Sequence, residues 1–182
     1  MLTPDKLLVL DLDETLIYSR RHTLAGEPDF DVGPFHVYKR PHLDYFLATC
    51  FEWFQVGVWT SASPDYAAGV VQALFPEADR LAFVWTADRC TVVYDEELGG
   101  YCARKSLKKL LGRGYARASV IVMDDSPEKW RQSYGNLVEV LPFLGAEDDE
   151  ELTRLLPYLH YLRDLPDIRA VDKRQWRDQP LF

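Results

Sequence analysis

The chain has 182 residues, of which 47% are hydrophobic and 27% charged, and this is the size and composition of one ordinary globular domain. Its formal net charge of -8 at pH 7 disfavours general binding to nucleic acid or to an anionic membrane, because such binders present a surplus of Lys and Arg on one face. The three cysteines have no metal-type pair spacing, and their odd number fits a reducing compartment better than a disulfide framework.

The N-terminal sequence has no basic region followed by a long apolar stretch, so it predicts no secretory signal. No apolar run approaches the roughly 20 residues that span a bilayer, which predicts no membrane partner. We therefore expect a cytoplasmic location, and a nuclear one stays open.

The first part of the chain contains two strand patterns and one helix pattern. Residues 6–10 form a short apolar run, typical of a strand that is buried on both faces. A polar stretch follows at 19–34, and residues 35–38 then predict a strand of a small hairpin. Pro41 is suited to open a helix, whose apolar positions keep helical spacing as far as Cys50.

The middle of the chain repeats the order of strand, polar turn and helix. Residues 54–59 predict a second buried strand, and apolar side chains at helical spacing predict a helix over 67–74. Residues 81–85 predict a third strand. A small hairpin is expected over 91–103, turning at two glycines, and Ser106 is a candidate N-cap for a short helix after it.

The last third of the chain predicts two more strands, at 119–123 and 137–140. The acidic segment 147–151 then predicts the start of a helix, because negative charges are favourable at a helix N-terminus. The leucines of that helix share one face. They are Leu152, Leu155, Leu156, Leu159 and Leu162.

Strands that alternate with helices predict an α/β fold, since parallel strands need helical crossovers. We expect a Rossmann-like, mostly parallel five-stranded sheet flanked by helices, with small β-hairpin insertions. Residues 1–165 are predicted to form this domain, and residues 166–182 a C-terminal tail that packs on it.

Polar side chains follow three of the predicted strands. Ligand sites in parallel sheets lie beyond the carboxyl ends of the strands, so we expect these side chains to converge. They are Asp11 and Asp13, Thr60 and Ser61, and Asp124 and Asp125.

Carboxylates gathered at one place repel each other, and burying them without a partner would cost several kcal/mol. A cation is their natural companion, and Mg²⁺ prefers such oxygen ligands. Zn²⁺ fits less well, because no Cys or His lies at these positions. Asp11 is placed to attack phosphorus and form an acyl phosphate, with Asp13 as acid and base. Thr60 and a lysine such as Lys105 would hold the phosphoryl oxygens.

Four motifs carry a resemblance to a known family. Asp11-Leu12-Asp13-Glu14-Thr15-Leu16 resembles the first motif of the haloacid dehalogenase superfamily, in the form typical of RNA polymerase II C-terminal-domain phosphatase-like (NLI-interacting factor-like) proteins. Residues 59–63 resemble the second motif, 105–107 the lysine motif and 122–127 the acidic fourth motif. Their order and spacing agree from Leu7 to about Leu162.

This resemblance implies a phosphatase that uses an aspartyl-phosphate intermediate and Mg²⁺. It implies that Asp11 is nucleophile and metal ligand, and that Asp13 is the acid and base with its backbone carbonyl on the metal. Asp125 becomes the third protein ligand, while Asp124 orients the lysine or a metal-bound water. Lys105 is preferred over its basic neighbours in the sequence by the motif alone.

Beyond the four motifs, some positions match the family pattern and others depart from it. Ser61, Tyr66 and Arg89 match positions close to the substrate phosphate in relatives. Ser106 stands where relatives often have Asp beside the lysine, and Ser63 stands where some polymerase-tail phosphatases have an apolar residue. These departures do not affect the expected reaction, but they prevent the assignment of a particular substrate.

The short gaps between the motifs leave no room for a large cap domain, so we expect an open site that admits a phosphoprotein. Phosphoserine or phosphothreonine is favoured over phosphotyrosine. A small-molecule or nucleic-acid-end phosphatase on the same scaffold is the main alternative. A binding module that lost catalysis is a second alternative, which the retained site residues disfavour. Those residues are Asp11, Asp13, Thr60, Lys105 and Asp125.

Overall fold

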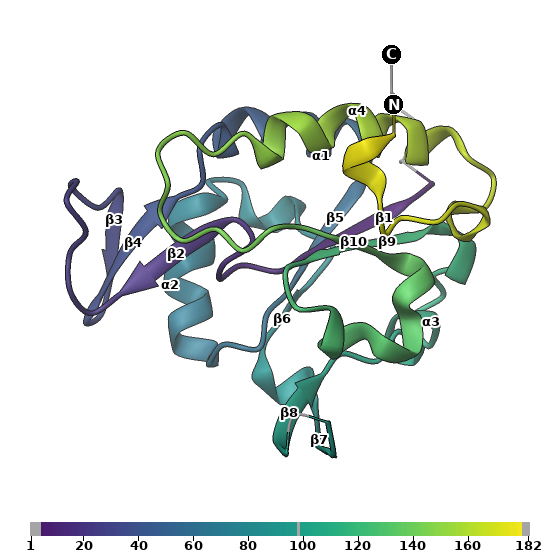
Figure 1. The fold of residues 1–182 in the computed structure, drawn as a ribbon, viewed down its shortest axis with the longest axis horizontal. Helices are drawn as coiled ribbons and strands as arrows, with labels where there is room; N and C mark the ends of the chain where they lie inside the picture. The colour runs from purple at the N-terminus through teal and green to yellow at the C-terminus, as the bar shows by residue number, and fades with distance from the viewer. Residues whose placement is uncertain (1–4, 98, 180–182) are drawn as a thin grey trace.

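The computed structural model describes residues 5–97 and 99–179. At its centre is a parallel sheet with the strand order β10-β9-β1-β5-β6 (Figure 1). Its strands are β1 (Leu7–Leu10), β5 (Gln55–Trp59), β6 (Val84–Trp85), β9 (Val120–Asp124) and β10 (Leu137–Glu139). All neighbouring strands pair in parallel, so the prediction of an α/β fold with a five-stranded parallel sheet is confirmed.

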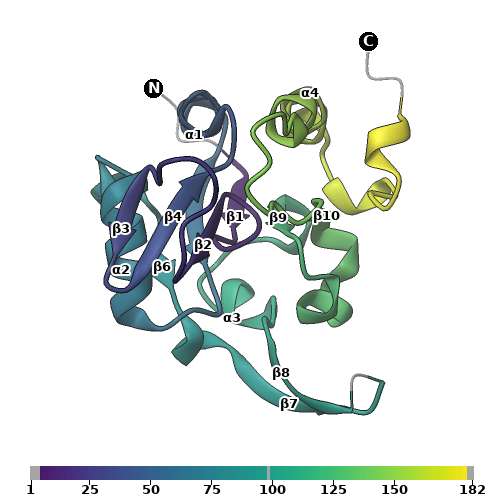
Figure 2. The same cartoon turned by 60° about the vertical axis from the view of Figure 1, so that its left-hand side comes forward.

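Helices cover both faces of the sheet because the central strand β1 is apolar at every position. Leu8 and Leu10 point into a core shared with α1, α2 and α4, and Leu7 and Val9 point into a second core shared with α3 and η4. α1 and α4 lie side by side in both views (Figures 1 and 2). The helices are α1 (Leu43–Trp53), α2 (Pro64–Leu74), α3 (Lys108–Leu111), α4 (Glu151–Asp164) and the 3-10 helix η4 (Pro127–Asn136).

Two small antiparallel sheets are inserted between these elements, as predicted. β2 (Ile17–Arg20), β3 (Phe30–Val32) and β4 (Phe35–Lys39) form one, with the order β2-β4-β3. β7 (Thr91–Asp95) and β8 (Gly100–Arg104) form the other, which extends away from the rest of the molecule (Figure 2). The remaining 3-10 segments are η1 (Ala78–Arg80), η2 (Ala87–Arg89), η3 (Arg117–Ser119), η5 (Ile168–Ala170) and η6 (Trp176–Asp178).

Some details of the predicted elements differ from the structure. The stretch 19–34 contains β3, whose Val32 packs so closely on α2 that a side-chain carbon at Gly69 would lie 2.6 Å from it. Ser106 does not cap α3, since Leu107 occupies the N-cap position. α4 begins only at Glu151.

The helix η4, between β9 and β10, was not predicted at all. It is a 3-10 run with a kink at Ser133, where φ is -142°. Only Trp130, Ser133 and Asn136 are buried in its ten residues, so it lacks the apolar periodicity that indicates a helix.

The segment after α4 contributes to the main core. Ile168 and Trp176 are both buried, and the Trp176 ring stacks on Tyr158 at 5.7 Å between centroids. The Trp176 indole donates a 2.8 Å hydrogen bond to the backbone carbonyl of Glu139 at the sheet edge. The division of the chain at residue 165 stays a prediction. Across the described ranges, no helix combines the length and apolarity that crossing a bilayer requires.

A buried arginine joins the start of α4 to the loop after β1. Arg40 is 1% exposed and binds Asp149 through two hydrogen bonds, from Nε at 2.7 Å and from Nη2 at 2.8 Å. Its Nη1 donates a 3.0 Å hydrogen bond to the backbone carbonyl of Thr15. This arrangement fixes the loop that carries the first acidic motif.

Replacing Asp149 with Asn should lower the free energy of unfolding by about 2 kcal/mol at neutral pH, because Arg40 would keep a buried charge without its carboxylate. Burial opposes ionisation of Asp149, but the Arg40 hydrogen bonds hold its pKa below the ordinary value. Such a group stabilises fully above its unfolded pKa of about 4, and this contribution disappears as the pH falls through the folded pKa. Urea unfolding should therefore show the difference shrinking below about pH 4. Asp148→Asn, at an exposed neighbour, is the matched control.

Candidate active site

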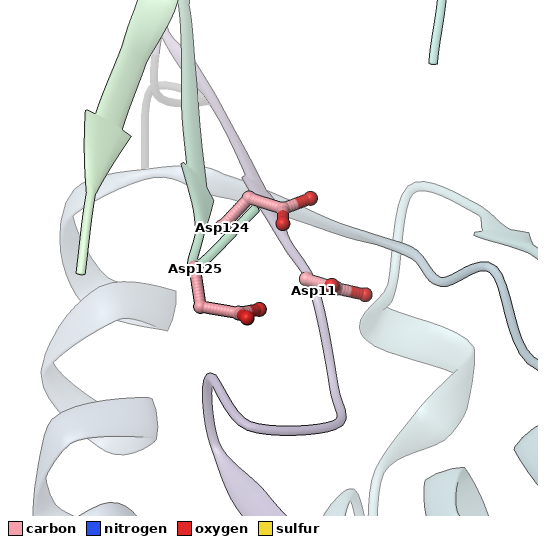
Figure 3. Close-up of side chains that lie close together, drawn as sticks. All are labelled: Asp11, Asp124 and Asp125. Atoms are coloured by element: carbon pink, nitrogen blue, oxygen red, sulfur yellow. The ribbon is translucent and has the colours of Figure 1, made fainter. Parts of the chain in front are cut away.

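Three carboxylates meet beyond the ends of the two central strands. Asp11 follows β1, Asp124 ends β9, and Asp125 comes next (Figure 3). One oxygen of each lies within 4.8 Å of the others. The parallel register explains the arrangement, because Leu10 pairs with Met123 and the Asp11 backbone N–H donates to the Met123 carbonyl at 3.0 Å.

Lys105, at the end of the β7–β8 hairpin, lies between two of these carboxylates. Its Nζ is 3.1 Å from Asp11 Oδ1 and 2.6 Å from Asp124 Oδ2, and its side chain is fully buried. Arg104 instead pairs with Asp95, and Lys109 donates to the backbone carbonyl of Arg89. The structure thus brings Lys105, rather than these two neighbours, to the carboxylates.

Asp124 is held from several directions. The Trp130 indole donates a 2.8 Å hydrogen bond to its Oδ2, and the Ser126 backbone N–H donates a 2.9 Å bond to its Oδ1. Burial opposes its ionisation, but the charges of Lys105 and Lys129, together with the hydrogen bonds from Lys105 and Trp130, keep the pKa of Asp124 below its ordinary value. Asp124 is therefore a fixed anion.

The pKa of Asp11 is shifted in the opposite direction to that of Asp124. Burial and the adjacent Asp124 carboxylate raise the pKa of Asp11 to about 7, although Lys105 and Lys129 oppose the shift. Among the described residues, its buried Oδ1 accepts no well-aligned hydrogen bond, although Lys105 Nζ lies 3.1 Å from it. A carboxylate with an unsatisfied buried oxygen next to two other carboxylates suits a hard divalent cation, which would keep it ionised.

Asp125 is oriented by hydroxyl groups. Thr15 Oγ1 donates to its Oδ1 at 3.1 Å, and Ser126 Oγ donates to its Oδ2 at 3.2 Å. The Asp125 backbone N–H in turn donates to Thr15 Oγ1 at 3.2 Å. Neutral donors leave the carboxylate its full charge and free lone pairs, so Asp125 is suited to bind a cation.

The Asp13 side chain is not part of the three-carboxylate cluster and instead contacts side chains of α2 and β2. Its Oδ1 accepts hydrogen bonds from the Tyr66 hydroxyl at 2.6 Å and from Ser19 Oγ at 3.3 Å. The chain turns sharply after it, with Glu14 at a φ of 60°. Burial raises the pKa of Asp13, although the Tyr66 hydrogen bond opposes this. A carboxyl group with a raised pKa is suited to donate and accept a proton.

The other predicted site residues differ in how far they are buried; they are Thr60, Ser61 and Arg89. Thr60 is buried at the end of β5, beside β1, and its Oγ1 accepts a 3.0 Å hydrogen bond from the Ala62 backbone. Ser61, next to it, is partly exposed. The Arg89 side chain is 58% exposed and pairs with Asp88 at 3.8 Å, and no salt bridge in the described chain joins it to the three carboxylates.

Sequence reasoning missed Lys129. Its Nζ lies 3.5 Å from Asp11 Oδ2 and 4.0 Å from Asp124 Oδ1. It belongs to η4, the helix that the sequence pattern did not predict. The available signal was a basic residue shortly after the acidic pair.

A parallel sheet with acidic motifs after two adjacent strands and a buried lysine between them defines a haloacid dehalogenase-like protein. The sequence profile described as NLI interacting factor-like phosphatase matches residues 6–169, which is most of the chain. The chain therefore belongs to the NLI interacting factor-like phosphatase family, and it is a phosphatase of that family.

Similar proteins agree with this assignment. CTD nuclear envelope phosphatase 1 of Xenopus tropicalis is 33% identical over 192 residues, which cover 97% of this chain and 75% of that protein. Nuclear envelope morphology protein 1 of Schizosaccharomyces pombe is 29% identical over 177 residues, covering 92% of this chain and 35% of that protein.

A solved structure shows the same fold. The fission yeast RNA polymerase II CTD phosphatase Fcp1 bound to beryllium fluoride superimposes with a TM-score of 0.58 at 23% identity. The match covers 76% of this chain but only 42% of that one, so this chain spans less than half the length of that structure.

Proposed function

We propose that this phosphatase hydrolyses phosphomonoesters of serine and threonine in proteins, through an aspartyl-phosphate formed on Asp11 and with Mg²⁺ as cofactor. One observation carries the proposal. The Asp11 carboxylate lies at the carboxyl end of β1, with ammonium groups near both of its oxygens and two further carboxylates within metal-binding distance.

In the proposed reaction, an Asp11 oxygen attacks phosphorus while the bond from phosphorus to the substrate oxygen breaks. Asp13 gives its proton to the departing alkoxide, which its raised pKa favours. Asp13 then takes a proton from the water that attacks the acyl phosphate, which releases inorganic phosphate and restores Asp11. Lys105 and Thr60 would hold the phosphoryl oxygens during both steps.

The proposed metal ligands are Asp11, Asp125 and the Asp13 backbone carbonyl, while Asp124 holds Lys105. The short bond between Lys105 and Asp124 supports this division, because a carboxylate already engaged by an ammonium group and an indole has less capacity left for a cation. A bound Mg²⁺ would supply positive charge to offset the repulsion between phosphate and carboxylates.

A protein substrate is supported by two observations. Relatives that cover nearly all of this chain are named CTD nuclear envelope phosphatases. In the described ranges, the insertions consist of two small antiparallel sheets, which leaves room at the sheet edge for a large substrate. A cytoplasmic location stays a prediction, and the names of the relatives make the nuclear envelope a second place to test.

Hydrolysis of an aryl phosphate by the purified protein tests the metal and the reaction together. We expect activity that EDTA abolishes and Mg²⁺ restores, and inhibition by beryllium fluoride with Mg²⁺ present. Activity that survives EDTA, or that only Zn²⁺ restores, would contradict the proposed cofactor. A protein without activity under all these conditions would contradict the function.

Substrate class needs a separate comparison. We expect phosphoserine and phosphothreonine peptides to give a higher kcat/KM than phosphotyrosine peptides. Sugar phosphates, nucleotides and oligonucleotides with a 3'-phosphate should give lower values still. If any of these three classes gives a higher kcat/KM than the phosphoserine and phosphothreonine peptides, the proposal of a protein substrate is wrong and that class replaces it. The proposed reaction would be unaffected.

A further inference from the structure

The site contains two lysines with different surroundings. Lys105 is fully buried, and its ammonium group makes short contacts with Asp124 and Asp11. Lys129 has an 18% exposed side chain, and its contacts with the same two carboxylates are 3.5 and 4.0 Å long. A charge-assisted hydrogen bond would measure about 2.7 to 2.9 Å. The ammonium group donates no hydrogen bond to another described residue, so it lies beside the proposed nucleophile with donors available for a ligand.

The backbone holds Lys129 firmly in this place. Its carbonyl accepts a 2.9 Å hydrogen bond from the Lys105 backbone N–H, which joins the two lysine segments directly. The next residue, Trp130, is 1% exposed and is tied to Asp124 by its indole. The backbone of Lys129 is thus held in place, and its side-chain ammonium group lies next to Asp11 Oδ2.

The charges of the site explain what such a lysine could do. Three carboxylates meet at the site, Asp11, Asp124 and Asp125, and among the described residues Lys105 makes the shortest ammonium contacts with them. A phosphoryl group would bring a further charge of about -1.5 to -2 at neutral pH. The Lys129 ammonium group, next to Asp11 Oδ2 and partly exposed, is placed to offset part of that charge.

We propose that Lys129 is a second phosphate-binding residue, which donates a hydrogen bond to a phosphoryl oxygen while Lys105 stays paired with Asp124. The inference rests on the proposed function and adds a residue to it. The competing explanation is that Lys129 only offsets the carboxylate charge. The two differ in which ligand the lysine affects: a phosphate-binding residue strengthens phosphate binding, whereas a purely balancing cation only competes with Mg²⁺.

The test compares wild type with Lys129→Met, a neutral side chain of similar length, using inorganic phosphate as the probe. With saturating Mg²⁺, we expect the inhibition constant of phosphate to rise about 10- to 100-fold, as for one lost hydrogen bond between charged groups. Protection of the folded protein by phosphate in thermal unfolding should fall in parallel, and this readout needs no turnover. Lys129→Arg should stay within about threefold of wild type. Lys108→Met removes an exposed lysine of α3 and is the matched control.

An unchanged phosphate inhibition constant in Lys129→Met, with a lower Mg²⁺ concentration for half-activation, would overturn the inference. An arginine variant that binds phosphate as weakly as Lys129→Met would also contradict it. If Lys129→Met does not fold, Lys129→Gln takes its place with the same expectations. The two proposals fail in different ways, because a wrong role for Lys129 leaves Mg²⁺-dependent hydrolysis by wild type intact, whereas a wrong function removes it.

Discussion

Asp11→Asn should abolish phosphate-ester hydrolysis, lowering kcat/KM by a factor of about 10³ or more. An amide oxygen cannot form the acyl phosphate, so the proposed path is closed at its first step. The variant should still fold, because Asn has nearly the volume of Asp. It also removes a carboxylate whose buried charge is disfavoured by Asp124, as the raised pKa of Asp11 shows.

The measurement is kcat/KM for an aryl phosphate at saturating Mg²⁺, together with the thermal unfolding midpoint of each variant. Asp125→Asn is the matched control, because it removes one negative charge from the same cluster but keeps an oxygen ligand. Its loss should be clearly smaller than that of Asp11→Asn. Equal losses in the two variants would show that charge alone matters, and retained activity in Asp11→Asn would contradict the nucleophile.

Lys105→Met should reduce both stability and activity. The side chain is completely buried between Asp11 and Asp124, so its removal leaves two carboxylates without their closest counter-ion. Loss of one partner from a buried ion pair typically costs about 3 to 5 kcal/mol. Urea unfolding without metal should show a loss of this order, and hydrolysis should fall because the phosphoryl oxygens lose their proposed lysine.

A double variant tests the physical reason for this loss. Adding Asp124→Asn to Lys105→Met removes the unpaired charge but keeps an acceptor for the Trp130 indole, so it should restore part of the stability. Lys108→Met changes the composition in the same way at an exposed position, and should alter stability by less than about 0.5 kcal/mol. A double variant less stable than Lys105→Met would contradict the ion-pair explanation.

The sequence allowed prediction of the sheet and of the side chains at its edge, because both follow from local patterns. An apolar run closed by acidic residues indicates where β1 and β9 end. Parallel pairing then places Asp11 beside Asp124 without knowledge of anything else in the fold. The roles of these residues stay predictions, but their proximity is a consequence of the topology.

Other parts of the site depend on contacts that no local pattern reports. Lys129 and Trp130 belong to η4, a 3-10 run whose position is set by packing rather than by apolar periodicity. After Asp13 the chain turns through a left-handed backbone conformation at Glu14, which residues other than glycine rarely adopt. Such geometry is visible only when the tertiary contacts that stabilise it are known.

The hydrogen bond from the Trp176 indole to the Glu139 carbonyl has a consequence for self-association. β10 is the last strand on its side of the sheet, and an open strand edge offers backbone groups to which another chain can add a strand. The carbonyl of Glu139 also accepts from Arg177 Nη2, so the segment after α4 occupies a position where such pairing would begin. Residues far from the chemistry thus occupy a backbone acceptor that an added strand would need.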